Sequence, residues 1–396
     1  MPPTRTATDM RASESPGSWL GAVQMNRGLG KPKVEILTIH FGINHGSVLQ
    51  CYALSKTLRE LGAEVEVVDY VPARYKMWNN VKIKYPEKSL PWKLAFLLAS
   101  SVIRFPQKVV FRGYLKKHLA LSRRFSEPRK LADGCPDADL YLVGSDQVWN
   151  SSYNGREDKS YLLGFAPQGA ARASYAASIG KDELTEEEGS GIARGVQSFW
   201  GVSVREERAA EQLANFGVEA RVDLDPVFLL DREQWCELAS TRTRREPYVL
   251  VYVIAQGYEE MVRQAREIAD RLGARLYILS VRPIRIPGVD RNFLFATPSD
   301  FLALFRDAAF VVSNSFHGTA FSIIFRKRFL TYAARYNARI ENILSIMGLG
   351  RRLVTKRFDD ALVSEEIDYV APAAAIAKGA ESARAYLRGL LEEAAR

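Results

Sequence analysis

The sequence predicts an α/β protein with two open parallel-sheet domains that face each other across a cleft. Two observations predict this class. Short apolar runs alternate with amphipathic helical patterns along most of the chain. A polar, basic stretch around residues 241–247 then divides this alternation into two series. At 396 residues the chain is long for one domain and comfortable for two.

The first series opens with a strand–helix–strand unit. Residues 33–39 have the pattern of a buried strand, and residues 64–70 have the pattern of a second. Between them, apolar residues recur at helical spacing and end at Gly62, a typical stop after a helix. Such a unit implies a right-handed crossover and a parallel sheet, whose ligands bind at the carboxyl ends of the strands.

The remaining elements complete two domains and a tail. Further strands of the first domain are expected at 139–143, 172–177, 202–204 and 221–224, and those of the second at 248–254, 276–279 and 309–312. Thr185 and Ser299 are candidate helix caps. The predicted organisation is a disordered leader (1–32), an N-terminal domain (33–235) with a basic, apolar insertion (about 76–130), a C-terminal domain (246–350), and a helical tail (351–396) ending in one long helix.

Composition excludes several classes of protein. Hydrophobic residues make up 47% and charged residues 26%, as in an ordinary soluble protein. Three distant cysteines without CxxC spacing argue for a reducing compartment and against a zinc site, and four histidines do not suggest metal catalysis. Residues 1–32 lack the apolar core of a signal peptide, so we expect a cytoplasmic protein.

The net charge of +9 is concentrated near residues 92–124, where basic and apolar residues alternate. Such a stretch predicts peripheral contact with an anionic membrane surface. Helices packed on the domain with solvated Lys and Arg explain it equally well. Nucleic acid is not expected, because no recognition motif accompanies the charge. No run reaches the length expected of a membrane-spanning helix.

The tetrapeptide Ser315-Phe316-His317-Gly318 is the strongest functional signal. An apolar run precedes it and another follows, which predicts a strand, a tight turn and the start of a helix. Backbone N–H groups and the helix dipole at such a turn suit an anion, and His317 adds a proton carrier. The pattern indicates a phosphorylated or carboxylated substrate. A purely structural, hydrogen-bonding histidine is the alternative.

Six segments together resemble the polysaccharide pyruvyl transferase family and cover roughly residues 33–350. They are NHGSVLQ (44–50), VGSDQVWN (143–150), SYAASIG (174–180), SVRE (203–206), DPVFL (225–229) and NSFHGT (314–319). The resemblance implies two Rossmann-like domains similar to the GT-B glycosyltransferases. It also implies transfer of a pyruvyl group from phosphoenolpyruvate to two hydroxyls of a sugar, giving a ketal and phosphate, with no cofactor.

The resemblance further implies an acceptor in exopolysaccharide, capsule or cell-wall glycan, often on a lipid carrier. Such a carrier would explain the basic, apolar residues 92–124 as a membrane contact, and it would place the protein at the inner face of the membrane. The cleft side of the C-terminal domain would bind phosphoenolpyruvate, and the N-terminal domain would bind the acceptor.

Each expected site residue has a role. His317 would exchange the proton, with Asp146 as base or sugar-hydroxyl binder. Phosphoenolpyruvate would contact Arg205, Asn314, Ser315, Gly318, Thr319 and Arg339. The acceptor sugar would contact Asn44, Gly46, Gln50, Gln147, Trp149 and Asn150.

Two of these assignments have structural alternatives. Arg205 would otherwise form an ion pair with Glu206 or Asp225. The turn at 146–150 would otherwise be structural, with Trp149 in the core. Asp225-Pro226 is interpreted as a turn that closes the first domain rather than as a catalytic group.

The chain departs from the family pattern at two positions. Many members have Arg two residues before the motif histidine, where this chain has Ser315, and residue 45 is often Tyr but here is His. The missing cation must come from elsewhere. Four arginines follow closely, and Arg339 is the choice among Arg326, Arg328, Arg335 and Arg339.

Three other functions were compared with pyruvyl transfer. A GT-B-type nucleotide-sugar glycosyltransferase is the main alternative, although no base- or ribose-binding signature stands out. A dinucleotide-binding oxidoreductase is disfavoured because the turn at 41–46 lacks GxGxxG spacing. A non-catalytic carbohydrate-binding protein is the least expected, given His317 and Arg205.

Overall fold

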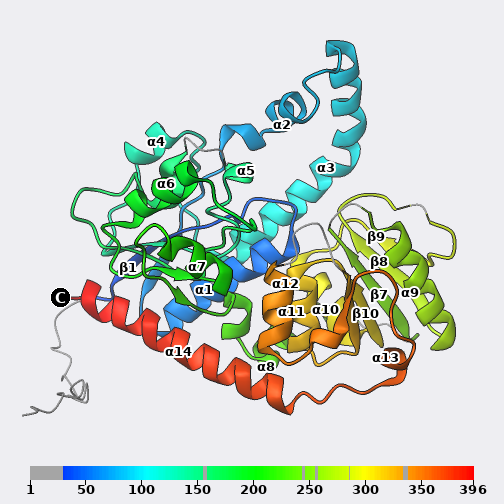
Figure 1. Ribbon diagram of the computed structural model, residues 1–396. Helices are drawn as coiled ribbons and strands as arrows, with labels where there is room; N and C mark the ends of the chain where they lie inside the picture. The colour runs from blue at the N-terminus through cyan, green and yellow to red at the C-terminus, as the bar shows by residue number, and fades with distance from the viewer. Residues whose placement is uncertain (1–29, 155–157, 243–245, 255–256, 285, 333–337) are drawn as a thin grey trace, which may run out of the picture. The chain divides into compact units, whose positions relative to one another are not determined.

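The computed structural model describes residues 30–154, 158–242, 246–254, 257–284, 286–332 and 338–396. Residues 31–396 form one compact unit that contains two parallel sheets flanked by helices (Figure 1). The predicted α/β class is therefore confirmed. The leader expected over 1–32 lies almost entirely outside the described residues.

The first sheet has four parallel strands in the order β2-β1-β3-β4. They are β1 (Lys33–Leu37), β2 (Glu64–Val67), β3 (Leu140–Val143) and β4 (Arg172–Ser174). Single parallel bridges link β4 and the residues after it to the two-stranded sheet of β5 (Ser203–Val204) and β6 (Arg221–Val222). The chain runs from β1 to β2 on one side, and β3 lies on the other, so the strand order reverses between β1 and β3.

The helices of this first part vary widely in length. They are α1 (His45–Glu60), α2 (Met77–Lys84), α3 (Leu90–His118), α4 (Pro128–Ala132), α5 (Ser151–Asn154), α6 (Glu186–Val196), α7 (Glu207–Ala214) and α8 (Arg232–Leu238), with 3₁₀ turns at Ala73–Tyr75, Lys159–Leu162 and Pro226–Leu229. Thr185 caps α6 through a capping box, as expected from its three following glutamates.

The second sheet has six parallel strands in the order β12-β11-β10-β7-β8-β9. They are β7 (Tyr248–Val253), β8 (Arg275–Ser280), β9 (Arg291–Phe293), β10 (Phe310–Ser313), β11 (Phe329–Tyr332) and β12 (Leu353–Val354). The order reverses between β7 and β10. Ligands of open α/β sheets bind at such reversals, outside the carboxyl ends of the strands.

The helices of the second part alternate with its strands. They are α9 (Glu259–Arg271), α10 (Pro298–Asp307), α11 (Phe316–Ile324), α12 (Ala338–Ile346), α13 (Ala361–Ser364) and α14 (Val370–Ala394), with a 3₁₀ turn at Gly350–Arg352. Thr297 caps α10 and Pro298 takes its first position. The expectation that Ser299 caps this helix was wrong, because Thr297 reaches the backbone N–H of Asp300.

Most predicted strands are present but shorter than expected. The segments at 33–39, 64–70 and 172–177 leave the sheet two or three residues early, because the chain then turns to present polar groups at the strand ends. The strands β9, β11 and β12 were not predicted. Residues 351–396, expected to be a helical tail, supply β12 before α14 begins, so this segment also belongs to the second sheet.

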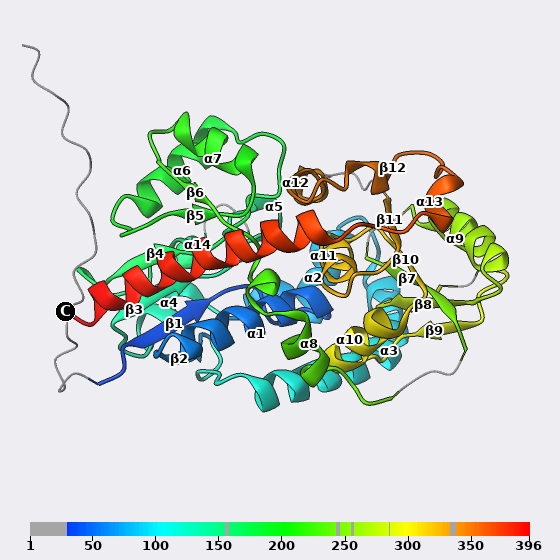
Figure 2. The same ribbon diagram turned by 90° about the horizontal axis from the view of Figure 1, so that it is seen from below.

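Helix α14 returns the chain to the first sheet (Figure 2). Ala383, Leu387 and Leu391 are buried in the hydrophobic cluster that also contains residues of β1, β3 and α1. The Tyr386 hydroxyl donates to the Ser174 carbonyl oxygen at 3.0 Å. The last helix therefore packs on the first half of the chain although it follows the second sheet in sequence.

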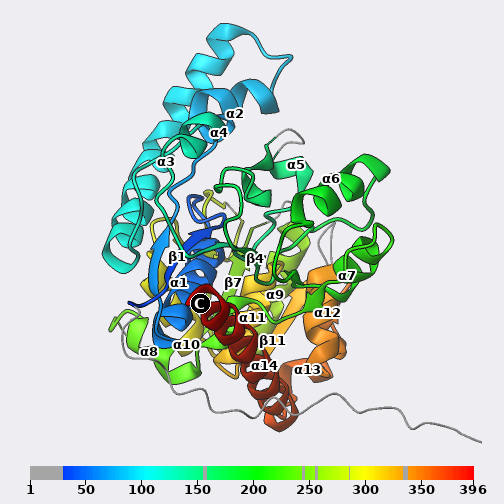
Figure 3. The ribbon, with the colours of Figure 1, turned by 90° about the vertical axis from the view of Figure 1, so that its left-hand side faces the viewer.

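Helices α2 and the first part of α3 extend away from the two sheets (Figures 1 and 3). The last turns of α3 are anchored, with Phe111, Tyr114 and Leu115 buried. Helix α3 is long and apolar enough to cross a membrane by length and composition, and only 11% of its most apolar window is buried. The expectation that no run reaches this length does not hold for α3, because it considered uninterrupted apolar residues, and Lys93, Arg104 and Lys108 interrupt this helix.

Two glutamates, one of them buried, lie side by side in the first sheet. Glu35 on β1 is in register with Glu66 on β2 and is 5% exposed. The pKa of Glu35 is raised from 4.5 to about 9, mainly by burial and to a lesser extent by the charge of Glu66. Glu35 is therefore protonated in the folded protein at neutral pH, whereas it ionises in the unfolded chain.

Glu35→Gln is expected to stabilise the protein at alkaline pH. The unfolded carboxyl titrates near 4.5 and the folded one near 9, so Glu35 lowers the free energy of unfolding as pH rises between these values. The variant should gain at least about 1 kcal/mol at pH 8 and almost nothing at pH 4. Urea unfolding of both proteins at the two pH values measures this, and a pH-independent difference would contradict it.

Candidate active site

Loops from both sheets meet at the carboxyl ends of their strands. We call the following residues the strand-end cluster: Gly46 and Ser47 after β1, Ser145 and Asp146 after β3, Arg205 and Glu206 after β5, Asp225 after β6, and His317 after β10. All of their side chains are buried or nearly so. The cluster lies at the reversals of strand order in both sheets, where ligands are expected.

His317 occupies the first turn of α11. Ser315 caps this helix, and its hydroxyl accepts a hydrogen bond from the Gly318 N–H at 3.4 Å. The His317 Nε2 lies 3.7 Å from Asp225 Oδ2, too far for a hydrogen bond but close enough for electrostatic attraction. This buried nitrogen has no hydrogen-bond partner among the described residues.

Gly46 lets helix α1 approach His317 closely. A Cβ atom at position 46 would lie 2.2 Å from Cγ and Nδ1 of the imidazole. Asn44 caps α1 by accepting hydrogen bonds from the backbone N–H groups of Gly46 and Ser47. The predicted site residues Asn44 and Gly46 therefore lie at the cluster, and Gly46 sets the position of His317.

Arg205 forms a buried ion pair at the centre of the cluster. Its Nη1 lies 2.5 Å from Asp225 Oδ2, and its Nε lies 3.4 Å from Glu206 Oε1. The guanidinium also stacks on the ring of Phe316 at 4.5 Å. Its Nη2 is buried without a hydrogen-bond partner among the described residues. The alternative ion-pair interpretation of Arg205 thus holds for two of its nitrogens, and the third is unsatisfied.

Opposite charges determine the ionisation of this pair. Burial alone would raise the pKa of Asp225, but His317, Arg205 and the Val227 N–H lower it well below its usual range. Burial alone would lower the pKa of Arg205, but Asp225, Glu206 and Asp146 raise it. Both groups are therefore charged at neutral pH.

Asp146 lies beside this ion pair in a strained backbone conformation. Its φ of 73° is in the left-handed region, which is uncommon for a residue with a side chain. The Ser47 hydroxyl donates to Asp146 Oδ2 at 2.5 Å, and the Gln147 N–H donates to Oδ1 at 2.8 Å. Backbone pairing with Ala177 holds the turn in place. Such strain is typical of functional sites.

The other predicted residues of the 314–319 turn make internal hydrogen bonds. Asn314 Oδ1 accepts from the Ile254 N–H at 3.1 Å. The Thr319 hydroxyl donates to the Ser315 carbonyl and also contacts the Thr331 hydroxyl. Gly318 is pressed against the side chain of Ser313. These groups shape the turn, whereas the side chains of Phe316 and His317 contact Arg205 and Asp225 of the cluster.

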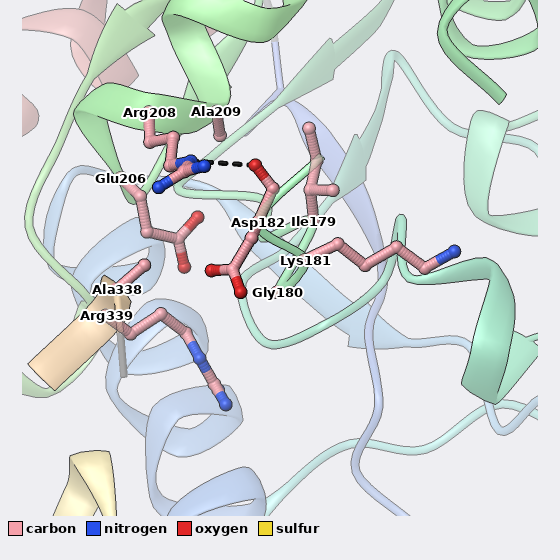
Figure 4. Close-up of a pocket in the computed structure, with 9 residues that line it drawn as sticks. All are labelled: Ile179, Gly180, Lys181, Asp182, Glu206, Arg208, Ala209, Ala338 and Arg339. Atoms are coloured by element: carbon pink, nitrogen blue, oxygen red, sulfur yellow. Dashed lines mark hydrogen bonds between the residues drawn. The ribbon is translucent and has the colours of Figure 1, made fainter. Parts of the chain in front are cut away.

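Arg339 lies near the cluster in an adjoining pocket. The first turn of α12 places it beside Glu206, Asp182 and Arg208 in a small pocket with a cavity volume of about 10 Å³ (Figure 4). Arg208 is held there by donating to the Asp182 carbonyl at 2.7 Å. Of the other arginines considered, Arg328 pairs with Glu366 at 3.6 Å and Arg335 lies outside the described residues.

The remaining predicted acceptor residues face inward. Trp149 is 5% exposed in the core, and its indole N–H donates to the Tyr161 carbonyl at 2.9 Å. Asn150 donates to Gln147 Oε1 at 2.8 Å. Gln50 is fully buried and donates to the Thr38 hydroxyl at 3.0 Å. These contacts agree with the structural interpretation of the 146–150 turn, with Asp146 as its member in the cluster.

His45 connects α1 to the second half of the chain. Its Nε2 lies 3.0 Å from the Ala296 carbonyl oxygen, and its ring stacks on Phe301 at 5.2 Å. Burial lowers the pKa of His45 to about 4, so it is neutral at physiological pH. His45 therefore acts as a packing and hydrogen-bonding group in this chain.

Sequence reasoning did not include Asp225 in the candidate site. It was interpreted as a closing turn, and its Oδ1 does accept the Val227 N–H of the 3₁₀ turn. Its Oδ2, however, also accepts from the Ser145 hydroxyl at 3.2 Å and lies between Arg205 and His317. Its position directly after a strand of the parallel sheet was the signal that could have identified it.

The family model described as "Polysaccharide pyruvyl transferase" matches residues 44–334, which include every residue of the strand-end cluster. The chain belongs to this family. The suspected family is thus confirmed, and the activity expected of the chain is that of a transferase in polysaccharide synthesis. No curated protein sequence matched the chain.

Solved structures with a similar course of the chain are distant in sequence. A putative UDP-N-acetylglucosamine 2-epimerase from Listeria monocytogenes is 12% identical, with 90% of this chain and 91% of that chain covered and a TM-score of 0.47. A UDP-glucosyltransferase from Polygonum tinctorium is 10% identical, with 93% and 98% covered and a TM-score of 0.46. The family assignment rests on the sequence match alone.

Asp225→Ala is expected to destabilise the fold by about 3–5 kcal/mol, because it removes the carboxylate that pairs with the buried Arg205 guanidinium. Asp360→Ala is the matched control, since Asp360 is exposed and pairs with Arg271 at 2.8 Å on the surface. The control should change the stability little, because solvent screens an exposed ion pair. Denaturant unfolding measures the loss of unfolding free energy in both variants. Equal losses would contradict the expected penalty for breaking the buried ion pair.

Proposed function

We propose that the protein transfers a pyruvyl group from phosphoenolpyruvate to two hydroxyls of a sugar in an exopolysaccharide, capsule or cell-wall glycan. The products are a pyruvate ketal and phosphate. Family membership supports the reaction class. The observation that carries the proposal is the buried Nε2 of His317 at a helix N-terminus, which lies 3.7 Å from a carboxylate and has no hydrogen-bond partner within the described part of the chain.

His317 is proposed as the proton donor. Protonation of the methylene carbon of phosphoenolpyruvate makes C2 an oxocarbenium-like electrophile, which a sugar hydroxyl attacks. Phosphate then leaves, and the second hydroxyl closes the ring. The Asp225 carboxylate attracts an imidazolium at 317 electrostatically and, with Gly46, keeps the ring oriented. The two hydroxyl protons balance the one given to carbon and the one taken up by phosphate or solvent.

Asp146 is proposed as the group that binds the attacking hydroxyl and takes its proton. Its Oδ2 already accepts one hydrogen bond, from Ser47, which orients the carboxylate without neutralising it. A carboxylate oxygen has room for a second donor, such as a sugar hydroxyl. The acceptor would then approach from the first half of the chain, residues 33–235.

Two arginines are proposed to bind the anionic donor. The unsatisfied Nη2 of Arg205 suits one carboxylate or phosphate oxygen, while its other nitrogens hold the ion pairs. Arg339, which lines the same small pocket as Glu206, is proposed to supply the second cation that Ser315 does not. The N–H groups at the start of α11 add to this field, with residues 246–350 as the donor side. No cofactor enters the reaction.

Substitutions around His317 are expected to reduce turnover in a graded way. His317→Ala should lower kcat by about 10²–10⁴-fold, the usual contribution of a general acid. Gly46→Ala should lower it in the same direction, by about 100-fold, because the new methyl displaces the imidazole. The assay is phosphate release from phosphoenolpyruvate with a panel of oligosaccharides that carry neighbouring free hydroxyls.

The matched control for this series is Gly191→Ala in helix α6, where an added methyl meets nothing within 4 Å. It should keep full activity and gain about 0.5–1 kcal/mol in stability from the better helix former. Circular dichroism checks that each variant is folded. A folded His317→Ala protein with normal turnover would remove His317 from the mechanism.

Phosphoenolpyruvate is expected to raise the melting temperature of the protein. A ligand that binds only the native state at 100 times its Kd adds about 2.7 kcal/mol of stability. Arg339→Ala should lose most of this shift, whereas Arg351→Ala, an exposed arginine paired with Glu365, should keep it. The measurement is differential scanning fluorimetry with phosphoenolpyruvate and, separately, with nucleotide sugars. A shift with a nucleotide sugar alone would instead indicate glycosyl transfer.

A further inference from the structure

One projecting segment carries the net charge of the whole chain. We call residues 76–118 the arm, which comprises α2, the turn after it and α3. The arm contains ten Lys and Arg residues and a single acidic residue, Glu87, so its net charge is +9. The whole chain has the same net charge, so the other residues balance to zero.

A row of bare apolar side chains runs along the arm. Leu90, Leu94, Leu98, Val102, Phe105 and Val109 follow one another at spacings of three or four residues, which places them on one face of α3. Their exposed fractions lie between 49% and 74%. At 1.5 Å per residue the row is about 30 Å long. Such an exposed row marks an interaction surface.

The opposite face of α3 is packed and its base is anchored. Trp92 and Phe96 stack on each other, and Tyr85, which follows α2, meets both rings edge-on. Farther along, the Gln107 side chain donates to the carbonyl oxygens of Val281 and Leu294. The protein therefore holds the arm in place by one side and leaves the apolar row uncovered.

A group of cations beside the row has little acidic compensation. Lys84, Arg104 and Arg282 lie close enough together that, after burial, their mutual repulsion lowers the pKa of Lys84 and of Arg104. Burial and the charges of Arg104 and Arg124 likewise lower the pKa of Lys108. Like charges gathered next to an apolar row indicate an anionic partner with an apolar interior.

We propose that the arm binds the surface of an anionic lipid bilayer. The apolar row enters the boundary between headgroups and acyl chains, and the Lys and Arg residues contact the anionic headgroups. A second copy of this chain fits this face less well, because each arm would bring a charge of +9 to the other.

The arm lies on the bilayer and does not cross it. A spanning α3 would place Lys93, Arg104 and Lys108 in the hydrocarbon, where each charge is costly. The packed face carries α2, and the last turns of α3 are buried beside the first sheet, so the helix is not free to be surrounded by lipid. Length and composition alone would have allowed it to span.

This docking also bears on the acceptor, in a step that rests on the proposed function. A protein held on the cytoplasmic leaflet by its arm would meet sugars that are attached to a lipid carrier in that leaflet. The acceptor class would then be a lipid-linked glycan rather than a free oligosaccharide.

The test is sedimentation of the full chain with vesicles. The protein should bind vesicles of phosphatidylcholine with 30% phosphatidylglycerol, bind pure phosphatidylcholine weakly, and be released by high salt. The double variant Leu98→Gln and Phe105→Gln should bind at least 10-fold more weakly. Val370→Gln is the matched control, since Val370 is 76% exposed on α14 and should bind normally.

A second pair of variants isolates the charge. Lys88→Gln with Lys108→Gln should weaken binding about 25-fold, roughly five-fold for each cation removed. Lys378→Gln with Arg388→Gln removes the same charge from exposed positions on α14 and should have little effect. Equal losses in the two pairs would mean that only net charge matters and would overturn a specific role for the arm.

Three other results would overturn the proposal. Binding that resists both high salt and alkaline carbonate would indicate a spanning helix. Absence of vesicle binding, with self-association that Leu98→Gln and Phe105→Gln abolish, would indicate a second copy as the partner. Absence of both would leave the row without a lipid role. Vesicle binding needs no phosphoenolpyruvate, so His317→Ala should bind fully whether or not the proposed reaction is correct.

Discussion

The buried pairing of Arg205 with Asp225 is the interaction around which the site is organised. A guanidinium and a carboxylate that are both removed from water must remain paired, because either one alone is strongly unfavourable. Arg205 follows β5 and Asp225 follows β6, so the pair joins two neighbouring strand ends. Asp225 then faces His317 from the second sheet, and Ser145 from the first. One ion pair thus connects groups from four loops.

The parallel sheets explain why these loops meet. Each sheet reverses its strand order once, between β1 and β3 in the first and between β7 and β10 in the second. The polar turns after β1, β3 and β10 carry Gly46, Asp146 and His317. The close approach at Gly46 then puts the backbone of α1 directly against the imidazole. Strain at Asp146 is tolerated because the hydrogen bonds from Ser47 and Gln147 hold its carboxylate.

The arm and the strand-end cluster show two different uses of charge. In the cluster, carboxylates and one guanidinium compensate each other, so ions are retained in a buried place. In the arm, cations gather with little acidic compensation beside exposed apolar side chains. The first arrangement suits chemistry at a sheltered site, and the second suits attraction to an extended anionic surface. Both follow from where acidic residues are present or missing in the sequence.

The sequence alone was enough to predict the α/β class, most of the strands, the family and the turn that carries His317, because hydrophobic periodicity and local motifs record these features. The family match confirms the family, while the roles of the site residues stay predictions. Only the tertiary structure revealed that Asp225 joins Arg205 to His317, that Thr319 and Trp149 bond internally, and that β12 and α14 complete the two halves. The contact of Asp225 with His317 and the packing of α14 join residues that are distant in the sequence, and the other contacts depend on how nearby side chains are oriented. Neither spacing nor composition records such contacts.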